Sequence, residues 1–217
     1  MVPRAAIVPL LVLVAGCGSA DPQELPAPAR PAASPPLAAP PDGRVTPGRA
    51  FPADVIELER GRTPLDGGRK VAVVAPRERV VEVFDAASGA RVGRAGAGVG
   101  PTNVGSDGGG YLFVVDTAGG ALLVFHVRPR LELIRRYPLP GSPYAIAVDN
   151  RRHRMFVTQT ARNQLTELIV GGRPSLVRRW ATPRQPDRVG VDEATGRVYV
   201  AGAADGVVQR LDPERTR

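Results

Sequence analysis

The apolar residues of this chain fall into short runs that alternate with turns. Val, Ile, Phe and Tyr recur with the spacing of strands, and residues 53–217 contain no stretch with the period of a helix. The turns are rich in Gly, Asp and Asn, as in Asp107–Gly110, Ala118–Gly120, Asp149–Asn150 and Asp205–Gly206. This pattern predicts an all-β domain of short antiparallel strands.

The pattern repeats about every forty-three residues. Phe113, Phe156 and Tyr199 are separated by this period, and so are the apolar residues at 125, 168 and 211. A fixed period of this length is typical of propellers and solenoids. Four short strands per repeat favour a β-propeller of about four blades with four-stranded antiparallel sheets. The expected domain is 53–217, with blades near 53–100, 101–142, 143–185 and 186–217.

The repeats also resemble a known family. Their pattern is Pro-x-x-x-Ala-Val-Asp, a turn, Arg-x-aromatic-Val, a loop and then Val-x-x-Leu, and the copy from Pro143 to Pro183 is the clearest. This order is similar to the YVTN or YncE-like repeat, and to the related NHL repeat, although the usual Asn after the second strand is missing. The resemblance implies a propeller fold and hardly restricts activity.

Closure of the ring is open to two interpretations, because about fifteen strands are evident where four full blades need sixteen. Asp54–Leu58 serves either as the first strand of the first blade or as the last strand of the last blade, beside Val207–Leu211. The Pro that precedes Asp54 echoes the start of each repeat and favours the first arrangement. That arrangement leaves an unpaired strand near Leu211, and a second copy could pair with it as a homodimer.

The first seventeen residues read as a targeting segment. Ala5–Ala15 is an apolar run after Arg4, too short to span a bilayer and of the right length for a signal peptide over residues 1–16. The run ends in Leu13–Cys17, which resembles a bacterial lipobox. The resemblance implies that Cys17 is acylated and holds the chain to the extracytoplasmic face of the cell membrane. A plain secretory signal with a chance cysteine is the alternative.

Residues 17–52 are expected to be a spacer. Ten prolines lie between Asp21 and Pro52, and no periodic apolar face is present that could offset the entropy of ordering this segment. An extended, disordered stalk would hold the propeller up to about 100 Å from the membrane.

The formal net charge is +8, carried by Arg with Lys70 as the only lysine. This surplus permits contact with anionic surfaces such as lipid headgroups or cell-wall polymers. GC-rich coding gives the same composition without any functional reason, and no nucleic-acid partner is expected. Cys17 is the only cysteine, so an internal disulfide is excluded.

Few residues suggest chemistry. Asp149 and Asp192 recur after the first strand, either to bind a cation or to bond the following turn. The superposed segments 135–137 and 178–180 carry Arg-Arg-aromatic, either to protect an outer edge or to form a basic rim. His126 and His153 lack metal-ligand spacing. We expect no catalytic residue, metal or cofactor.

A ligand is expected on one face of the propeller, formed by the loops that enter each first strand and those that join second and third strands. The predicted function is a binding or scaffold module for a protein or an envelope polymer. The alternative is a metal-dependent hydrolase or lyase resembling the propeller lactonases. The candidate residues are Thr102, Asn103, Asp116, Tyr144, Gln159, Arg162, Asn163, Asp187, Arg188 and Asp205.

Overall fold

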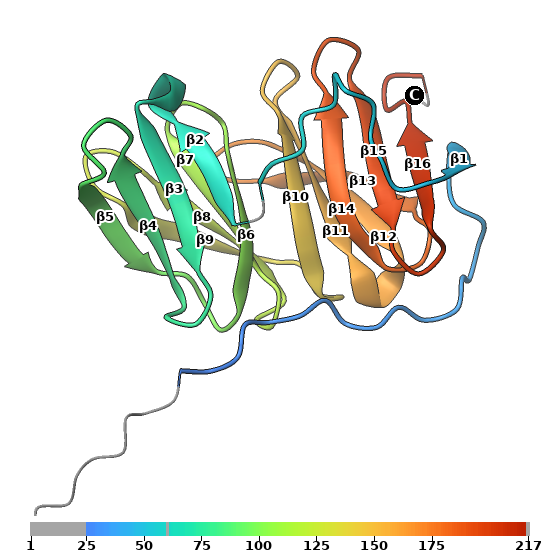
Figure 1. Cartoon of the computed structure of the whole chain (residues 1–217), viewed down its shortest axis with the longest axis horizontal. Coiled ribbons are helices and arrows are strands. Elements are labelled where there is room, and N and C mark those ends of the chain that lie inside the picture. The colour runs from blue at the N-terminus through green and yellow to red at the C-terminus, as the bar shows by residue number, and fades with distance from the viewer. Residues whose placement is uncertain (1–24, 60, 216–217) are drawn as a thin grey trace, which may run out of the picture.

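Four antiparallel sheets of four strands each form the fold in a computed structural model, which describes residues 25–59 and 61–215. Strands account for 51% of the described residues and helix for 3%, and the sheets are arranged as a four-blade propeller-like fold (Figure 1). The predicted fold class is therefore confirmed. Within the described residues, no helix is long and apolar enough to span a bilayer.

Blades 1 to 3 each use four consecutive strands, and blade 4 uses three plus one from the N-terminal segment. Blade 1 contains β2 (Arg62–Leu65), β3 (Lys70–Ala75), β4 (Val80–Asp85) and β5 (Arg91–Gly96). Blade 2 contains β6 (Pro101–Ser106), β7 (Tyr111–Asp116), β8 (Ala121–His126) and β9 (Glu132–Pro138). Blade 3 contains β10 (Pro143–Asp149), β11 (Arg154–Gln159), β12 (Gln164–Ile169) and β13 (Ser175–Ala181). Blade 4 contains β14 (Pro186–Asp192), β15 (Arg197–Gly202), β16 (Val207–Leu211) and β1 (Arg44–Pro47).

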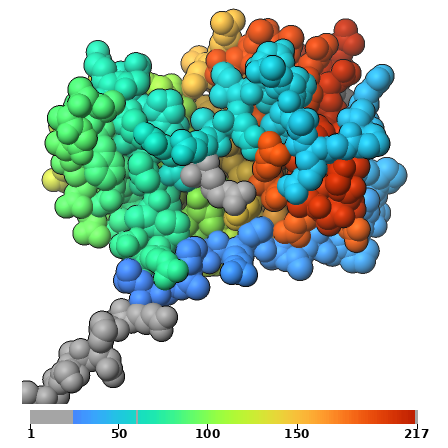
Figure 2. Space-filling model, in the orientation of Figure 1, coloured from blue at the N-terminus to red at the C-terminus, as the bar shows by residue number. Residues whose placement is uncertain are grey.

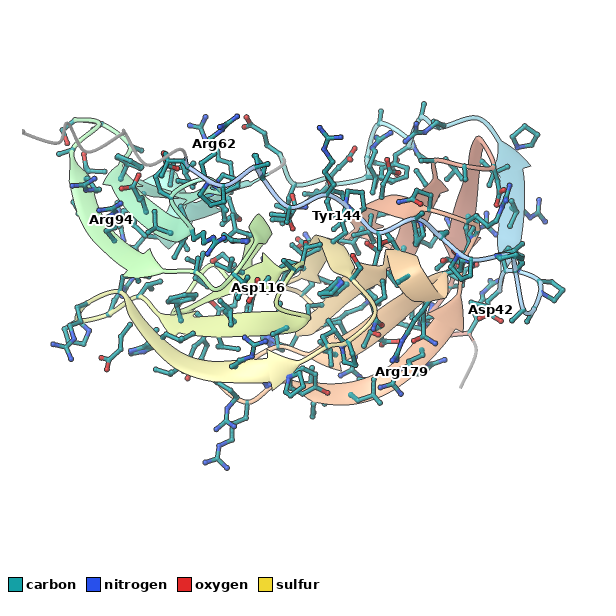
Figure 3. The ribbon with its side chains drawn as sticks, turned by 90° about the horizontal axis from the view of Figure 1, so that it is seen from below. Asp42, Arg62, Arg94, Asp116, Tyr144 and Arg179 are labelled. Atoms are coloured by element: carbon teal, nitrogen blue, oxygen red, sulfur yellow. The ribbon has the colours of Figure 1, made fainter. Side chains whose placement is uncertain are left out.

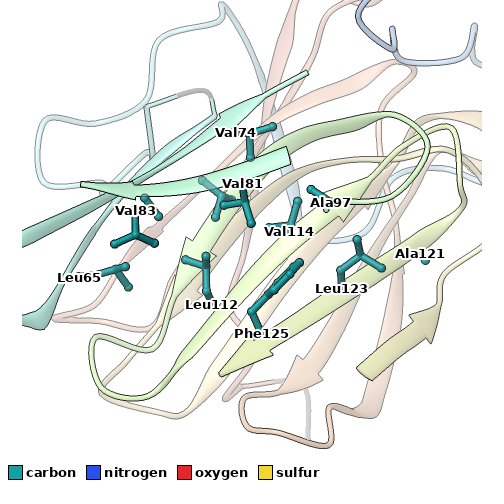
Figure 4. Packing of buried hydrophobic residues seen from close by; sticks show 12 residues of the cluster. Leu65, Val74, Val81, Val83, Ala97, Leu112, Val114, Ala121, Leu123 and Phe125 are labelled. Carbon is teal, nitrogen blue, oxygen red and sulfur yellow. The ribbon is translucent and has the colours of Figure 1, made fainter. Parts of the chain in front are cut away.

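Successive side chains of each middle strand point to opposite faces of the sheet, so they pack alternately against the preceding and the following blade. In β7, Leu112 and Val114 pack against blade 1, whereas Phe113 and Val115 pack against blade 3. Figure 4 shows the first of these layers, with Val81 and other residues of blade 1 above those of blade 2. The core is therefore a set of three layers, one between each pair of consecutive blades.

The repeated aromatics lie between blades as predicted, with one exception. Phe113 and Phe156 have 0% and 2% of their surface exposed. Tyr199 is only half-buried, because no blade follows blade 4 in the described chain. Its ring instead lies 6.3 Å from that of Phe51, in the segment between β1 and β2.

The last blade is completed by the N-terminal segment. β1 pairs antiparallel with β16, so that Arg44 lies opposite Arg210 and Pro47 opposite Val207. The prediction of a free spacer through residue 52 is wrong here, because the backbone of residues 44–47 satisfies the open edge of β16. The expected unpaired strand near Leu211 is covered, and the strand-sharing homodimer loses its basis.

Both predicted placements of Asp54–Leu58 are wrong. Ile56 exchanges two backbone hydrogen bonds with Val191 of β14, at 2.8 and 3.1 Å. This segment therefore lies along the inner edge of blade 4 and reaches neither blade 1 nor β16. The inner strand of blade 1 is β2, whose sequence Arg-Thr-Pro-Leu has too few apolar residues to stand out as a strand. Figure 1 shows the segment crossing the front of blade 4 on its way to β2.

The outer face of blade 1 keeps the pattern of a buried face. Val71, Val73 and Phe84 are half-exposed, and nothing among the described residues forms a blade in front of them. The equivalent residues of the later blades are buried against the preceding blade: Leu112, Val114 and Phe125 in blade 2, Met155, Val157 and Leu168 in blade 3, and Val198, Val200 and Leu211 in blade 4. The two ends of the arc thus differ, since only blade 4 has its end face covered.

Replacing Phe156 by Ala should lower the free energy of unfolding by about 3–5 kcal/mol, because its ring fills the layer between blades 3 and 4. Chemical denaturation monitored by circular dichroism measures this loss. Phe84→Ala is the matched control at the uncovered end and should cost less than half as much. Equal losses would mean that the outer face of blade 1 is covered in solution.

Replacing Gly43 by Ala should detach β1 from β16. Gly43 has φ of +68°, and a Cβ would collide with the backbone carbonyl oxygen of Arg210. The expected cost is about 1–3 kcal/mol, with faster amide exchange in Val207–Leu211 and self-association by light scattering. Gly48→Ala is the control, since φ is +112° there but no atom lies within 4 Å of the added Cβ. Unchanged exchange in β16 after Gly43→Ala would contradict the role of this glycine.

Candidate ligand face

One end of every sheet carries the loops on which a ligand was expected, and we call this end the lower face. Its loops span 76–79, 97–100, 117–120, 139–142, 160–163, 182–185 and 203–206. The opposite end, with the turns that join first to second and third to fourth strands, is the upper face. Figure 1 shows the lower face at the bottom of the view.

The N-terminal segment 25–43, here called the strap, crosses the lower face from blade 2 to blade 4 (Figures 1 and 2). Ala32 donates its N–H to Ser142 Oγ at 3.1 Å, and Ser34 Oγ donates to the carbonyl of Thr160 at 2.7 Å. Gln185 accepts the N–H of Ser34 at 3.0 Å and donates to the carbonyl of Ala32 at 3.0 Å. The described part of the expected spacer is therefore bound to the propeller.

The proline-rich composition of the strap suits this role as well as it suits a free stalk. Proline has no N–H, so an extended strap leaves few donors to be satisfied on the surface. Three of the donors that remain, at Ala32, Ser34 and Asp42, have a partner on blade 3 or blade 4. Polar loop residues supply most of these partners, and only the folded propeller brings them together.

Three of the predicted ligand-binding residues lie beneath or beside the strap. Asn163, at a left-handed φ of 48°, donates to the carbonyl of Pro35 at 2.9 Å. Gln159 is buried and donates to the carbonyl of Pro140 at 2.5 Å while accepting from Thr166. The side chain of Arg162 lies against Gly141. The first two are structural, and only Arg162 retains a charged group without an ion-pair partner among the described residues.

Asp116 organises the loop that enters β6. Its Oδ1 accepts the N–H groups of Val99, Gly100 and Gly119 at 3.1, 2.8 and 3.0 Å. Its Oδ2 lies 3.6 Å from Arg136 Nη1, and the carboxylate is fully buried. The glycine-rich stretch 96–100 is thus an interblade loop built around a carboxylate, so Asp116 is unavailable to a ligand.

Thr102, Asn103 and Tyr144 form one buried cluster between blades 2 and 3. Asn103 donates to the carbonyl of Tyr144 at 2.7 Å and accepts the N–H of Gly61 at 3.1 Å. Thr102 Oγ1 lies 2.6 Å from Thr117 Oγ1. Figure 3 shows Asp116 and Tyr144 in the interior of the view from below, whereas Arg94 and Arg179 lie towards its periphery. This cluster joins the inner strands and ties them to the chain that leads into β2.

Asp187 and Arg188 bind the segment between β1 and β2. Arg188 makes two hydrogen bonds to Glu57, at 2.6 and 2.5 Å, and its guanidinium lies 4.6 Å from the ring centre of Phe51. The hydrogen bonds that Arg188 donates to Glu57 raise the pKa of Arg188 above its ordinary value, against the effect of burial. Asp187 holds Arg49 at 3.0 Å. Both residues therefore fasten the crossing segment to blade 4.

A cavity of about 330 Å³ lies beside Arg188, along the inner strands. Leu58, Asn103 and Ile146 line it together with the Glu57–Arg188 ion pair. Its volume is at the lower end of the range for small-molecule sites. Since its charged groups are already paired with each other or with Arg49, the cavity offers a ligand mostly amide and apolar surface.

The remaining predicted site residue, Asp205, binds Arg184 across two loops. It accepts the Arg184 N–H and Nε at 2.8 Å each. Burial alone would raise the pKa of Asp205, but these hydrogen bonds and the arginine charge hold the pKa below its ordinary value of 3.8.

The recurring Asp residues bond the turns that follow them. Asp192 accepts the N–H groups of Ala194 and Thr195 at 2.9 and 3.2 Å, and a hydrogen bond from the Thr195 hydroxyl lowers its pKa. Asp149 accepts from the N–H of Arg152 at 3.1 Å. These contacts support the turn interpretation. Across residues 25–59 and 61–215, no three His, Cys, Asp or Glu side chains are grouped so that they could hold a metal ion.

The paired arginines of the outer strands are mostly engaged within the molecule. Arg135 donates to the carbonyl of Gly172 at 3.2 Å, and Arg136 to that of Gly119. Arg178 binds Glu167 at 3.2 Å and lies over Trp180, whereas Arg179 has no ion-pair partner in the described chain. The sequence analysis missed Glu167, a carboxylate with 2% of its surface exposed between Arg154 and Arg178. Its only signal was a charge in an otherwise apolar third strand.

Comparisons with known proteins agree on the fold and give no family. No protein-family model matches the sequence, and no curated protein matches it. A putative 6-phosphogluconolactonase from Bacteroides fragilis is 13% identical, with a TM-score of 0.59 over 77% of this chain and 54% of that one. The β-propeller domain of Cps50 (Swd1) from Myceliophteria thermophila is 15% identical, with a TM-score of 0.58 over 74% and 54%.

A functionally unknown protein from Desulfotomaculum acetoxidans is similar to the same extent, at 13% identity and a TM-score of 0.59 over 76% of this chain and 56% of that one. This chain spans just over half the length of each of these solved structures. At such identities the likeness shows the propeller fold alone.

Gln185→Ala should loosen the strap, because the amide makes two hydrogen bonds to residues 32–34. The expected loss is about 1–2 kcal/mol of unfolding free energy, with faster proteolysis within residues 25–43. Gln164→Ala, whose side-chain oxygen has no hydrogen-bond partner, is the control. Equal protease resistance of Gln185→Ala and the parent chain would show that the strap is held by other contacts.

Asp205→Asn should lose stability at neutral pH and not in acid. The lowered pKa means that ionised Asp205 stabilises the fold above pH 3.8, and that this contribution is lost as the pH falls through the folded-state pKa. We expect a difference of about 1 kcal/mol or less from the parent at pH 7, shrinking towards zero by about pH 2. Urea denaturation at both pH values measures it, and a difference that persists in acid would contradict this ion pair.

Proposed function

We propose that this chain is a lipid-anchored, extracytoplasmic propeller of the YVTN or YncE-like type that acts as a binding or scaffold module. The supporting observation is how the polar side chains of the lower face are used. Residues such as Asn163, Gln185 and Asp187 hold the N-terminal segment against the propeller. These contacts attach a rigid scaffold to the segment that carries Leu13–Cys17.

The lipobox resemblance supplies the anchor in this proposal. Cys17 lies outside the described residues, and its acylation is inferred from the sequence alone. A thioether-linked diacylglycerol places two acyl chains on the cysteine, and two chains are what stable membrane attachment requires. The partner is a protein or an envelope polymer, and co-purification from membranes followed by mass spectrometry identifies it.

The second candidate is a metal-dependent hydrolase or lyase, and one of the structural neighbours is named a putative 6-phosphogluconolactonase. Such chemistry needs carboxylates that converge on a divalent ion. Here the carboxylates of the lower face and the inner strands bind arginine instead, as in Asp116–Arg136, Asp205–Arg184 and Asp187–Arg49. Stoichiometric metal in the purified protein, with lactone turnover that depends on added Ca²⁺, would favour the enzyme over the binding module.

Cys17→Ala should abolish salt-resistant membrane attachment, because the thiol is the only acylation point in the chain. We expect either an unprocessed precursor or protein released from membranes by high salt, detected by fractionation and by the mass of the mature N-terminus. Ser19→Ala keeps the thiol and serves as the control. A processed Cys17→Ala protein that still partitions with membranes in high salt would refute the lipobox interpretation.

A further inference from the structure

Among the described residues, the N-terminal part of the chain first meets the propeller on the lower face. The first side-chain contact of the strap is Ala29, whose methyl group lies against Gly100, and its first hydrogen bond is made by Ala32 to Ser142. Both contacts lie on the lower face, and in Figure 1 the described chain begins below this face. A tether on Cys17 therefore pulls on the lower face.

The tether is also short, and this step rests on the proposed acylation of Cys17. Fifteen residues separate Cys17 from Ala32, which limits their distance to about 50 Å at full extension. The point at which the tether joins the propeller lies on the lower face, and this favours an orientation with the lower face towards the membrane.

The charges of the lower face suit such a position. Arg30, Arg77, Arg79 and Arg162 have no ion-pair partner among the described residues, and all four are exposed. Two carboxylates of this face, Asp116 and Asp205, bind Arg136 and Arg184. Glu78 and Asp42 are exposed and have no arginine partner among the described residues. Arginines near a lipid surface are attracted by anionic headgroups within a Debye length.

The upper face is built differently. Its arginines are mostly matched by carboxylates: Arg69 and Arg128 with Asp66, Arg152 with Asp149 and Glu214, and Arg197 with Asp212. Three exposed arginines, Arg151, Arg173 and Arg215, have no such partner among the described residues. They provide internal controls of the same type at the opposite end of the sheets.

We propose that the lower face of the propeller lies against an anionic lipid surface, with Arg30, Arg77, Arg79 and Arg162 towards the headgroups, and that the upper face is the one presented to a partner. The strap thereby fixes the orientation of the domain as well as its attachment. The expected ligand face and the accessible face are then different surfaces.

Energy transfer to labelled lipid headgroups tests the orientation in the acylated full chain. Because Cys17 is the only cysteine and is blocked by acylation, Arg77→Cys and Arg151→Cys each carry one reactive thiol. A donor at position 77 should be quenched more strongly than one at position 151 in vesicles that contain phosphatidylglycerol. Equal quenching, or stronger quenching at 151, would overturn the orientation.

The same labelling separates failure of this proposal from failure of the anchor. A chain that is not acylated would take up two labels per molecule, which shows the loss of the proposed anchor before any distance is read. The contact between the lower face and anionic lipid can then still be tested without the acyl anchor, by co-sedimentation of the Cys17→Ala full chain with vesicles.

Charge reversal tests the lipid contact itself. Arg30→Glu with Arg77→Glu should weaken binding of the Cys17→Ala chain to phosphatidylglycerol vesicles by roughly tenfold or more, and added salt should remove the difference. Arg151→Glu with Arg173→Glu should leave binding unchanged. Equal weakening by both pairs, or binding that is as strong to phosphatidylcholine vesicles, would reject a specific lipid-facing surface.

Discussion

The structure depends on the N-terminal segment covering both edges of the last blade. β1 satisfies the outer edge of β16, and Ile56 satisfies the inner edge of β14 through two backbone hydrogen bonds. Between them, Phe51 and Val55 lie over Gly190 and Tyr199, on the face where a following blade would pack. Unpaired edges and bare apolar faces favour aggregation, and one segment of about fifteen residues removes all three of these hazards at blade 4.

The repeat made most of the fold predictable from sequence. Alternation within each strand and the forty-three-residue period placed Phe113 and Phe156 between blades, because interblade packing repeats with the sequence. β1 and β2 were missed because neither carries that signal. Arg44–Pro47 has one large apolar residue and pairs with a strand more than 150 residues away, so its partner is set by ring closure and not by local pattern.

The candidate site was predictable only as a location. The sequence shows polar residues in the loops of the lower face, but it gave no sign that Asn163 and Gln185 bind the strap or that Asp116 binds the loop that enters β6. Side-chain hydrogen bonds between residues 128 or more positions apart depend on the path of the chain, which composition does not encode. A proline-rich segment with few large apolar residues has the composition typical of a disordered chain, whether it is free or bound to a folded surface.

The end faces of blades 1 and 4 differ in how they are covered. At blade 4 the strap and the crossing segment use apolar and polar groups together to close the sheet, whereas Val71, Val73 and Phe84 at blade 1 keep the interblade pattern with no blade in front of them. The two end faces of the arc are therefore not equivalent, since one is covered by the N-terminal segment and the other is uncovered. In the orientation proposed above, with the lower face towards the membrane, the open face of blade 1 would stand at the side of the domain.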